Sequence, residues 1–444
     1  MKTVKHAFWG SLLVLSALWL LTDPVDWTTL SGIFAWRNVL NQYTGILGIG
    51  VMSLAMMLSA RPVFLEKQFH GLDKMYRLHK WLGIAGLVLS ISHWLIANGP
   101  KWMVAWGWLE RGVRKPRPVL PEGSIQQLFM NQRGLAEGIG EWAFYLTALL
   151  MVLALVKTFP YRRFFQTHRI LALTYLALVF HSVILVKFDY WTSFLGITLA
   201  GLMTAGSVAA LMSLFRKRVG ATKVTGKVIA LEHQTALNVL SIDIQLDDGW
   251  RGHEAGQFAF VSFHADEGPH PFTITSKWNE SGTIRFLVKA LGDYTRTLPE
   301  RLHVGDSIEI EGPYGRFNFE SSSPRQIWVG GGIGITPFIA RMQELAKEPD
   351  GKAIHLFHTT TTYDQNAIDR LTRDAANAKI QLDVRWDERD GRLDLNGIIK
   401  AVPDWRSADV WFCGPAKFGQ VLREGLVRLG FPEQRFHQEL FEMR

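Results

Sequence analysis

Two apolar segments of the sequence each carry a pair of histidines at similar spacing. Segment 78–94 (LHKWLGIAGLVLSISHW) contains His79 and His93, and segment 167–182 (THRILALTYLALVFHS) contains His168 and His181. Ionisable residues are costly inside a bilayer, so histidines within a membrane span indicate a functional site. One such histidine alone is more often a hydrogen-bonded core residue or an interfacial anchor. Four at matched depth predict two helices that hold two stacked hemes, with one iron between each facing pair.

The spacing of these histidines agrees with a shared face only in part. His79 and His93 are separated by 14 positions, which on a helix places them roughly 21 Å apart on nearly the same face. His168 and His181 are separated by 13 positions, which leaves the second ring about 220° around the helix axis. Tighter local winding or an oblique crossing of the two helices would have to absorb this offset, and the sequence leaves both open.

Six apolar segments approach the roughly 20 residues needed to cross a bilayer. They lie at 7–22, 43–60, 78–97, 139–158, 167–187 and 191–215. A chain of 444 residues with 48% hydrophobic residues and 17 tryptophans fits a membrane protein that also carries soluble domains. The first 24 residues have the form of a secretory signal, but no clean cleavage site follows, so we interpret them as a retained first helix.

Basic residues between the segments predict the orientation of the chain in the membrane. Six crossings put both termini on one side, and the loops of that side carry Arg61, Lys67, Lys74, Arg77, Lys157, Arg162, Arg163, Arg216, Lys217 and Arg218. The positive-inside rule then places both termini and the soluble domains in the cytoplasm, with the protein in the inner (plasma) membrane. This orientation pairs His79 with His168 near the inner surface and His93 with His181 near the outer surface.

The loop 99–137 is an exception to that rule, because it is basic although it should lie outside. Its Trp-rich KWMVAWGWLERGV stretch is either an amphipathic piece in the membrane interface or an ordinary loop. The net charge is +8, but the basic residues do not form one long stripe along the chain, so nucleic acid is not an expected partner. Cys413 is the one cysteine, which excludes an intrachain disulfide.

The chain after residue 218 changes from apolar segments to strands and turns. Short β-like runs from 222 to about 319 predict a small antiparallel barrel, and strands that alternate with helices from 325 onward predict a parallel doubly wound sheet. The expected fold is therefore a multidomain membrane protein. Its six-helix transmembrane bundle (1–218) is followed by an antiparallel β-barrel domain (219–322) and an α/β doubly wound nucleotide domain (323–444).

The segment HPFTITS (270–276) follows a strand and resembles the flavin-binding motif of the ferredoxin-NADP reductase superfamily, in the form found in NADPH oxidases and ferric reductases. A strand that ends in a Pro turn would also explain it. The resemblance implies that Thr273 meets the isoalloxazine edge and that His270 lies near the FAD phosphates. KALGDYT (289–295) resembles the second FAD segment, and GPYG (312–315) resembles the loop that closes the flavin domain. The implied FAD contacts are His270, Pro271, Phe272, Thr273, Ile274, Thr275, Lys289, Gly292, Tyr294 and Thr295.

The segment GGGIGITPF (330–338) follows a strand and opens a helix. Glycines let the backbone approach a pyrophosphate, and a helix N-terminus supplies amide donors. With FCGP (412–415) at a later strand end, the segment resembles the nicotinamide-dinucleotide site of the same superfamily. The implied contacts are Gly330, Gly331, Gly332, Gly334, Thr336, Pro337, Thr360, Thr362, Cys413, Gly414 and Pro415.

Three residues are candidates for a catalytic role by this resemblance. Thr273 would meet the flavin, Cys413 would lie near the nicotinamide unless it is only a small buried residue, and Phe441 would cover the flavin until nicotinamide displaces it. Phe436 is a second candidate for that aromatic cover.

Nearly the whole chain resembles bacterial NADPH oxidase-like proteins and the ferric reductase superfamily, including the spacings of the four histidines. The resemblance implies a flavocytochrome b of the NAD(P)H oxidase or ferric reductase type. It would pass electrons from cytoplasmic NADPH or NADH through FAD and two b-type hemes to an acceptor outside, with O2 giving superoxide favoured over ferric chelate or quinone. A membrane redox sensor or transporter with a flavin domain is the alternative from another class. The expected partners are membrane lipid and a small-molecule acceptor, without nucleic acid or an obligatory protein partner.

Two positions depart from the family pattern. Thr362 stands where NADPH-selective relatives place an Arg, which favours NADH or weak discrimination between the nucleotides. Ala97 stands where eukaryotic superoxide-producing oxidases carry a polar His, which weighs against O2 as acceptor.

Overall fold

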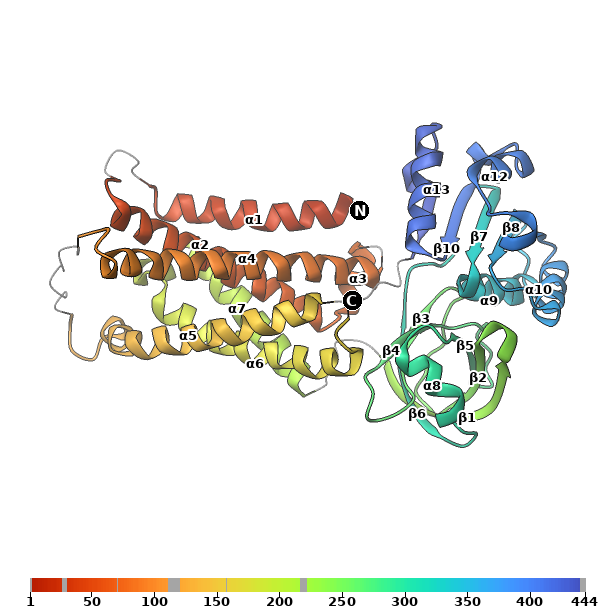
Figure 1. Ribbon diagram of the computed structural model, residues 1–444, viewed down its shortest axis with the longest axis horizontal. Coiled ribbons are helices and arrows are strands. Elements are labelled where there is room, and N and C mark those ends of the chain that lie inside the picture. Colours follow the sequence, from red (N-terminus) through yellow and green to blue (C-terminus); the bar gives the residue numbers. More distant parts are fainter. Residues whose placement is uncertain are drawn as a thin grey trace. The chain divides into compact units, whose positions relative to one another are not determined.

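The chain forms two compact units in a computed structural model, which describes residues 2–25, 30–69, 71–110, 120–156, 158–215 and 222–439. The helical unit comprises Met1–Pro62 and Lys74–Val219, and the β-rich unit comprises Val63–Asp73 and Gly220–Arg444. Figure 1 labels most of the helices and strands of both units. Lys157, Arg216, Lys217, Arg218 and Phe441 lie outside the described residues.

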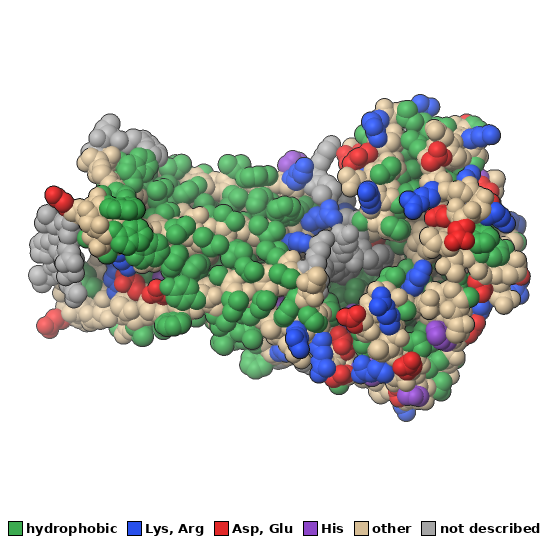
Figure 2. All heavy atoms as spheres, in the orientation of Figure 1, with side chains coloured by type: hydrophobic (Ala, Val, Ile, Leu, Met, Phe, Trp, Pro, Cys, Tyr) green, Lys and Arg blue, Asp and Glu red, His purple; other side chains and the backbone are tan. Residues whose placement is uncertain are grey.

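Six long helices make up the described part of the helical unit, and each is long and apolar enough to cross a membrane. In Figure 2 hydrophobic side chains cover most of the visible surface of these helices, whereas charged side chains are spread over the β-rich unit. A helix satisfies its own backbone hydrogen bonds, which is what a bilayer requires. The prediction of a six-helix multi-pass membrane protein is therefore confirmed. The helices are α1 (Lys2–Thr22), α2 (Ile33–Ser59), α4 (Leu72–Ala105), α5 (Ile125–Leu155), α6 (Tyr161–Leu185) and α7 (Phe194–Leu214), with the short 3-10 helix η1 (Phe188–Thr192) before α7.

Several of these helices extend well beyond the apolar segments of the sequence. α2 begins at Ile33 rather than near 43, α4 continues through Pro100 to Ala105, and α5 begins at Ile125 rather than near 139. The expectation of a loop over 99–137 was therefore wrong at both ends. Polar and charged side chains at a helix end leave the backbone hydrogen bonds intact, so a hydropathy pattern reports only the apolar part of each helix.

The packing of α2, α6 and α7 fixes the middle of the helical unit. The hydroxyl of Tyr175 on α6 hydrogen-bonds to Ser53 Oγ on α2 at 2.8 Å. Gly206 on α7 lies against the same ring, because a Cβ there would come 2.2 Å from Tyr175 Oη. Both Ser53 and Tyr175 are buried, so this contact holds α6 at a defined depth against its neighbours.

The first sheet of the β-rich unit is antiparallel, with the strand order β4-β3-β6-β1-β2-β5. An isolated bridge between Ile274, which follows β4, and Phe286 of β5 connects the two outer strands and nearly closes the sheet into a barrel. The predicted antiparallel barrel is thus present. Its strands are β1 (Thr222–Gln234), β2 (Val239–Leu246), β3 (Phe258–Ser262), β4 (His270–Thr273), β5 (Thr283–Lys289) and β6 (Ser307–Tyr314), with helix α8 (Asp293–Arg301) between β5 and β6.

The second sheet is parallel, with the order β11-β10-β7-β8-β9, as the strand and helix alternation predicted. Its core contains Trp328 and Trp411 on adjacent strands, both fully buried. The strands are β7 (Arg325–Gly331), β8 (Ala353–Thr360), β9 (Gln381–Trp386), β10 (Asp409–Cys413) and β11 (Phe436–Gln438). The helices are α9 (Thr336–Leu345), α10 (Gln365–Asn377), α11 (Asp387–Asp390), α12 (Leu395–Ala401) and α13 (Ala416–Arg428).

A short helix between two membrane helices belongs to the β-rich unit. α3 (Val63–Phe69) connects α2 to α4 along the chain, yet residues 63–73 cluster with the barrel and the parallel sheet. The buried carboxylate of Glu66 accepts a hydrogen bond from the backbone N–H of Gly315 at 2.7 Å. The sequence pattern did not predict this association.

Candidate heme, flavin and nucleotide sites

The structure brings the four membrane histidines together in the two expected pairs. The imidazole centroids of His79 on α4 and His168 on α6 lie 6.0 Å apart, and those of His93 and His181 lie 6.3 Å apart. The interplanar angles are 68° and 84°. α6 is α-helical throughout Tyr161–Leu185, so both pairs form without a tighter 3-10 segment in this helix.

Neighbouring helices orient three of the four rings through Nδ1. His79 Nδ1 donates to the carbonyl of Ala55 on α2, and His181 Nδ1 donates to the carbonyl of Ala136 on α5, both at 2.8 Å. His93 Nδ1 lies 3.1 Å from the hydroxyl oxygen of Thr44. An N–H on Nδ1 leaves Nε2 with a lone pair, which is the form in which imidazole binds a metal.

A cavity of about 580 Å³ lies beside His93 and His181 and is lined by residues of α2, α4, α5 and α6. Arg37 lines it and donates to the carbonyl of Ala97 through Nη2 at 3.0 Å. Eukaryotic relatives that produce superoxide carry a polar His at the position of Ala97. In this protein the guanidinium of Arg37 from α2 lies at that position instead. Lys101 and Lys187 line the cavity as well.

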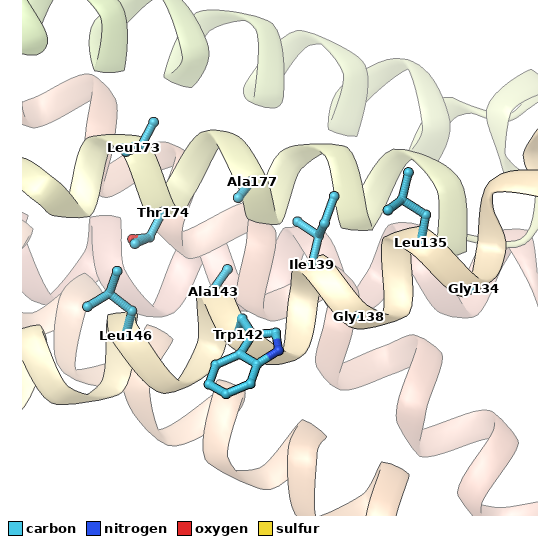
Figure 3. Close-up of a pocket in the computed structure, with 10 residues that line it drawn as sticks. All are labelled: Gly134, Leu135, Gly138, Ile139, Trp142, Ala143, Leu146, Leu173, Thr174 and Ala177. Atoms are coloured by element: carbon cyan, nitrogen blue, oxygen red, sulfur yellow. The ribbon is translucent and has the colours of Figure 1, made fainter.

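A second hollow, a groove of about 550 Å³, lies between α5 and α6 (Figure 3). Its lining is almost entirely apolar and includes Gly134, Leu146 and Leu173. In Figure 3 Trp142 projects from α5 at its side, and the hydroxyl of Thr174 is the polar group among the labelled side chains apart from that indole. None of the four paired histidines lines this groove, although Gly138 lines both it and the cavity beside His93 and His181.

The two segments predicted to bind FAD are in contact within the barrel. The ring of His270 on β4 stacks on Tyr294 at the start of α8, with centroids 5.0 Å apart and an interplanar angle of 16°. Tyr294 Oη is hydrogen-bonded to His264 Nδ1 at 2.7 Å. Burial lowers the pKa of His270 to about 4 and raises the pKa of the Tyr294 phenol, so both side chains are neutral at neutral pH.

The other residues of the FAD segments lie around this stack. Thr273 ends β4 and is buried, and Ile274 and Thr275 after it are also buried. Thr295 accepts hydrogen bonds from the backbone N–H groups of Leu291 and Gly292 at 3.1 and 3.0 Å. Thr295 therefore shapes the turn before α8 and caps the start of that helix.

The two glycine-containing turns of the parallel sheet pack backbone against backbone. A Cβ on Gly334 would come 2.2 Å from the carbonyl oxygen of Cys413, and a Cβ on Gly331 would come 2.8 Å from Pro415 Cδ. α9 starts directly after this loop at Thr336, with Pro337 in its first turn. The structure thus brings the 330–337 and 413–415 segments together at the carboxyl ends of β7 and β10, where nucleotides bind in such sheets.

Cys413, Thr360 and Thr362 occupy this edge in different ways. Cys413 is buried, and burial raises the pKa of its thiol, so the sulfur stays protonated and is not a thiolate nucleophile. Thr360 Oγ1 donates to the carbonyl of Thr362 at 2.6 Å, which shapes the exposed turn after β8. Phe441 lies outside the described residues, and Phe436 is buried and packs against Phe412.

Flavin and nucleotide segments also approach each other. β5, which ends at Lys289, contacts the 3-10 turn η3 (Gly332–Ile335) of the glycine loop. Burial lowers the pKa of His358 on β8 to about 4, and the nearby charge of Lys289 acts in the same direction. Residues implied for FAD and for the nucleotide are therefore neighbours in the β-rich unit.

Comparison with known proteins finds similarity in both the helical unit and the barrel of the β-rich unit. The family model of the ferric reductase like transmembrane component matches residues 44–179, and that of the oxidoreductase FAD-binding domain matches residues 228–319. The first range includes three of the paired histidines, with His181 just beyond it, and the second includes both FAD segments. The chain joins a ferric reductase-like transmembrane domain to an oxidoreductase FAD-binding domain.

Individual relatives match only parts of the chain. The flavohemoprotein of Bordetella pertussis is 28% identical over 212 residues, which cover 42% of this chain and 52% of that protein. The stachydrine N-demethylase reductase subunit Stc4 of Rhizobium meliloti is 28% identical over 226 residues, covering 46% and 63%. The solved flavohemoglobin of Malassezia yamatoensis aligns with a TM-score of 0.48 at 18% identity, covering 92% of this chain and 97% of that one. The chain spans about half the length of the curated flavohemoprotein that it matches.

The histidine pairs of the ferric reductase-like domain fit bis-histidine ligation of heme iron. Two imidazoles on opposite sides of one metal ion, each with a bond of roughly 2.0 Å, have centroids about 6 Å apart. The observed separations of 6.0 and 6.3 Å agree with this value. Ligating histidines almost always donate their other N–H to a fixed acceptor, as three of these four do.

Sequence patterns missed the groups that hold these rings. The acceptors at Ala55 and Ala136 are backbone carbonyls, which leave no trace in a sequence. Gly140 was also missed, although a Cβ there would come 1.9 Å from His181 Nδ1. Thr44 and Gly45, which lie against His93, could have been noticed as small residues in an apolar helix opposite the histidine segment.

Proposed function

We propose that the protein transfers electrons across the membrane, from NADPH or NADH on the cytoplasmic side through FAD and two b-type hemes to an acceptor on the outer side. The first candidate acceptor is O2, giving superoxide, and ferric chelate or quinone is the alternative. The observation that carries this proposal is the pair of facing imidazoles at each of two depths, 6.0 and 6.3 Å apart. When bound, flavin takes up a hydride and releases single electrons, and heme iron carries one electron at a time.

Residues of the chain would hold each group in a distinct way. His79 with His168 and His93 with His181 would supply two nitrogens per iron, which leaves no open coordination position. The acceptor would then be reduced at the heme edge rather than on the iron. In the β-rich unit, the stack of His270 on Tyr294 and the turn before α8 would position FAD.

The nucleotide would bind over the glycine loop between β7 and α9. Gly332 has a φ of +56°, and no atom lies within 4 Å of the position of a Cβ there, so the loop leaves space on this side for phosphates. The amides at the start of α9 would then face the negative charge. Cys413 would act as a protonated, uncharged neighbour of the nicotinamide, because its pKa is raised.

The test is turnover by the purified full-length protein with each nucleotide against a panel of acceptors. Oxidation of NADH or NADPH should reduce a b-type heme spectrum that corresponds to two hemes per chain. Superoxide dismutase-sensitive reduction of a reporter would identify O2 as acceptor, and anaerobic reduction of ferric chelate or quinone would identify the alternatives. A protein with flavin but without heme would contradict the proposal and leave the redox sensor or a membrane-bound flavin reductase.

A further inference from the structure

One of the four heme-ligand candidates is held by a side chain from another helix. Thr44 is buried on α2, and its hydroxyl donates to the carbonyl of Leu40 at 2.7 Å, one turn earlier in the same helix. The single hydroxyl hydrogen is used in that bond. The oxygen can therefore only accept from His93 Nδ1, which lies 3.1 Å away. This fixes the proton of His93 on Nδ1 and leaves Nε2 free.

The other histidines have no comparable side-chain partner among the described residues. His79 and His181 donate to the backbone carbonyls of Ala55 and Ala136, and Nδ1 of His168 has no hydrogen-bond partner within the described part of the chain. The carbonyl of Asn41 also faces His93, but as backbone it cannot be removed by substitution. Among the hydrogen bonds described for these four rings, the one from His93 to Thr44 is thus the one that a side-chain change can delete.

Close packing adds to the constraint on the same ring. A Cβ on Gly45 would come 3.2 Å from Cε1 of His93, so the helix backbone of α2 lies directly against the imidazole. The ring is therefore confined on one side by Gly45 and oriented by Thr44. Both residues act on the pair His93 and His181, whose cavity Thr44 lines.

We propose that Thr44 is a positioning residue that sets the orientation and the donor strength of His93 at the outer heme. This inference rests on the proposed heme function. A hydrogen bond from Nδ1–H raises the basicity of a ligating imidazole. A more basic ligand stabilises ferric over ferrous iron and so lowers the reduction potential of that heme. Loss of the Thr44 hydroxyl should raise the potential of the outer heme alone.

The test compares Thr44→Val, which keeps the shape and removes the hydroxyl, with Thr44→Ser, which keeps the hydroxyl. Thr174→Val is the matched control, because Thr174 is also buried and also hydrogen-bonded to its own helix at Leu171, but lines the groove of Figure 3 and not the cavity beside His93. The measurements on the full-length protein are heme content per chain, spectroelectrochemical titration of both hemes and low-temperature electron paramagnetic resonance of the ferric hemes.

In Thr44→Val one of two potentials should rise, so that at the wild-type midpoint the ratio of reduced to oxidised heme increases by up to about tenfold, equivalent to about 59 mV. Heme affinity at that site should fall by about tenfold. Thr44→Ser should restore both values, and Thr174→Val should leave both unchanged. If Thr44→Val does not accumulate, Thr44→Ala provides the same comparison.

The outcomes separate this inference from the proposed function. A two-heme protein whose potentials and resonance spectra are the same in Thr44→Val and wild type would overturn the role of Thr44 and leave the heme proposal intact. A shift of equal size in Thr174→Val would also overturn it. A wild-type protein without heme would overturn both.

Discussion

Gly140 of α5 lies directly against the imidazole of His181 of α6, so that a Cβ at Gly140 would come 1.9 Å from Nδ1 and 2.5 Å from Cε1 of the ring. The same ring donates to the carbonyl of Ala136, one turn earlier on α5. α5 therefore both anchors and confines His181. This contact explains why a glycine stands in the middle of a long membrane helix, where it costs roughly 0.5–1 kcal/mol relative to alanine.

Gly140→Ala should displace His181 and lower the heme content toward one heme per chain. Overpacking of this kind costs about 1–3 kcal/mol, and here the displaced group would be the proposed heme ligand itself. Gly134→Ala is the control, since no atom lies within 4 Å of a Cβ at that position on the same helix. Pyridine hemochrome analysis against protein concentration measures the effect. Equal heme content in both variants would contradict the placement of His181.

His93→Ala and His181→Ala should each lose one heme and electron transfer to the outer acceptor, while reduction of flavin by nicotinamide nucleotide continues. His79→Ala should lose the other heme. Removal of one imidazole would leave a heme iron at the proposed site with a single protein ligand. Anaerobic stopped-flow absorbance separates the flavin signal from the heme signals, with His233→Ala on β1 as a control for histidine replacement outside the membrane unit. Two hemes in any ligand variant would refute the pairing.

The histidine pairs and the order of the domains could be predicted because their signals are local. An ionisable residue in an apolar helix is conspicuous, and strand alternation or a glycine loop is visible within a few residues. The ends of α2, α4 and α5 could not be predicted from the apolar segments. Polar residues such as Asn38 in α2 and Gln127 in α5 lie within the helices, because the backbone hydrogen bonds of a helix do not depend on apolar side chains.

Contacts between distant segments left no local signal. The bond between Glu66 and Gly315 joins residues that are far apart in sequence, and no motif connects them. The assignment of α3 to the β-rich unit follows from such contacts alone. The carbonyls of Ala55 and Ala136 that accept from the histidines could not be predicted either, because every residue has a backbone carbonyl. The sequence therefore predicts which side chains carry chemistry, whereas the backbone groups that orient them emerge only in three dimensions.

Gly332→Ala should weaken nucleotide binding more than it weakens the fold. Its φ of +56° makes a side chain unfavourable by about 1–2 kcal/mol, and a methyl group would occupy the open space above the loop. Gly351→Ala is the control for strain, because Gly351 has a φ of +75° and equally open surroundings in the loop between α9 and β8. The KM for NADH or NADPH should rise in the first variant only. A rise of the same size in both would assign the effect to the backbone.

Gly334→Ala should behave differently and destabilise the β-rich unit itself. A Cβ there would come 2.2 Å from the carbonyl oxygen of Cys413, and a backbone oxygen cannot rotate away. The two turns at the sheet edge would have to separate, at a cost of about 1–3 kcal/mol. Thermal release of flavin fluorescence measures this loss. An unchanged release temperature in Gly334→Ala would mean that the two turns are not packed as described.

Acid should destabilise the β-rich unit through its buried neutral histidines. Burial lowers the pKa of His358 to about 4, and its Nδ1–H donates to the carbonyl of Gly330 at 3.2 Å. In the unfolded chain a histidine has a pKa of about 6.5. Above that pH the histidine is neutral in both the folded and the unfolded state, so it does not lower the free energy of unfolding. As the pH falls from about 6.5 toward 4, the unfolded state binds a proton that the folded state does not. The free energy of unfolding then decreases by about 1.4 kcal/mol per pH unit for each such group.

His358→Gln isolates the contribution of His358 to this slope. Glutamine has no group that takes up a proton in this pH range, so the free energy of unfolding should fall less steeply below about pH 6.5 than in the wild type. His270, whose pKa is also lowered to about 4 by burial, remains in place and accounts for part of the residual slope. Flavin release temperatures of the full-length protein between about pH 7 and pH 5 measure both slopes. Parallel curves for wild type and variant would show that His358 is already protonated, or exposed, in the folded protein.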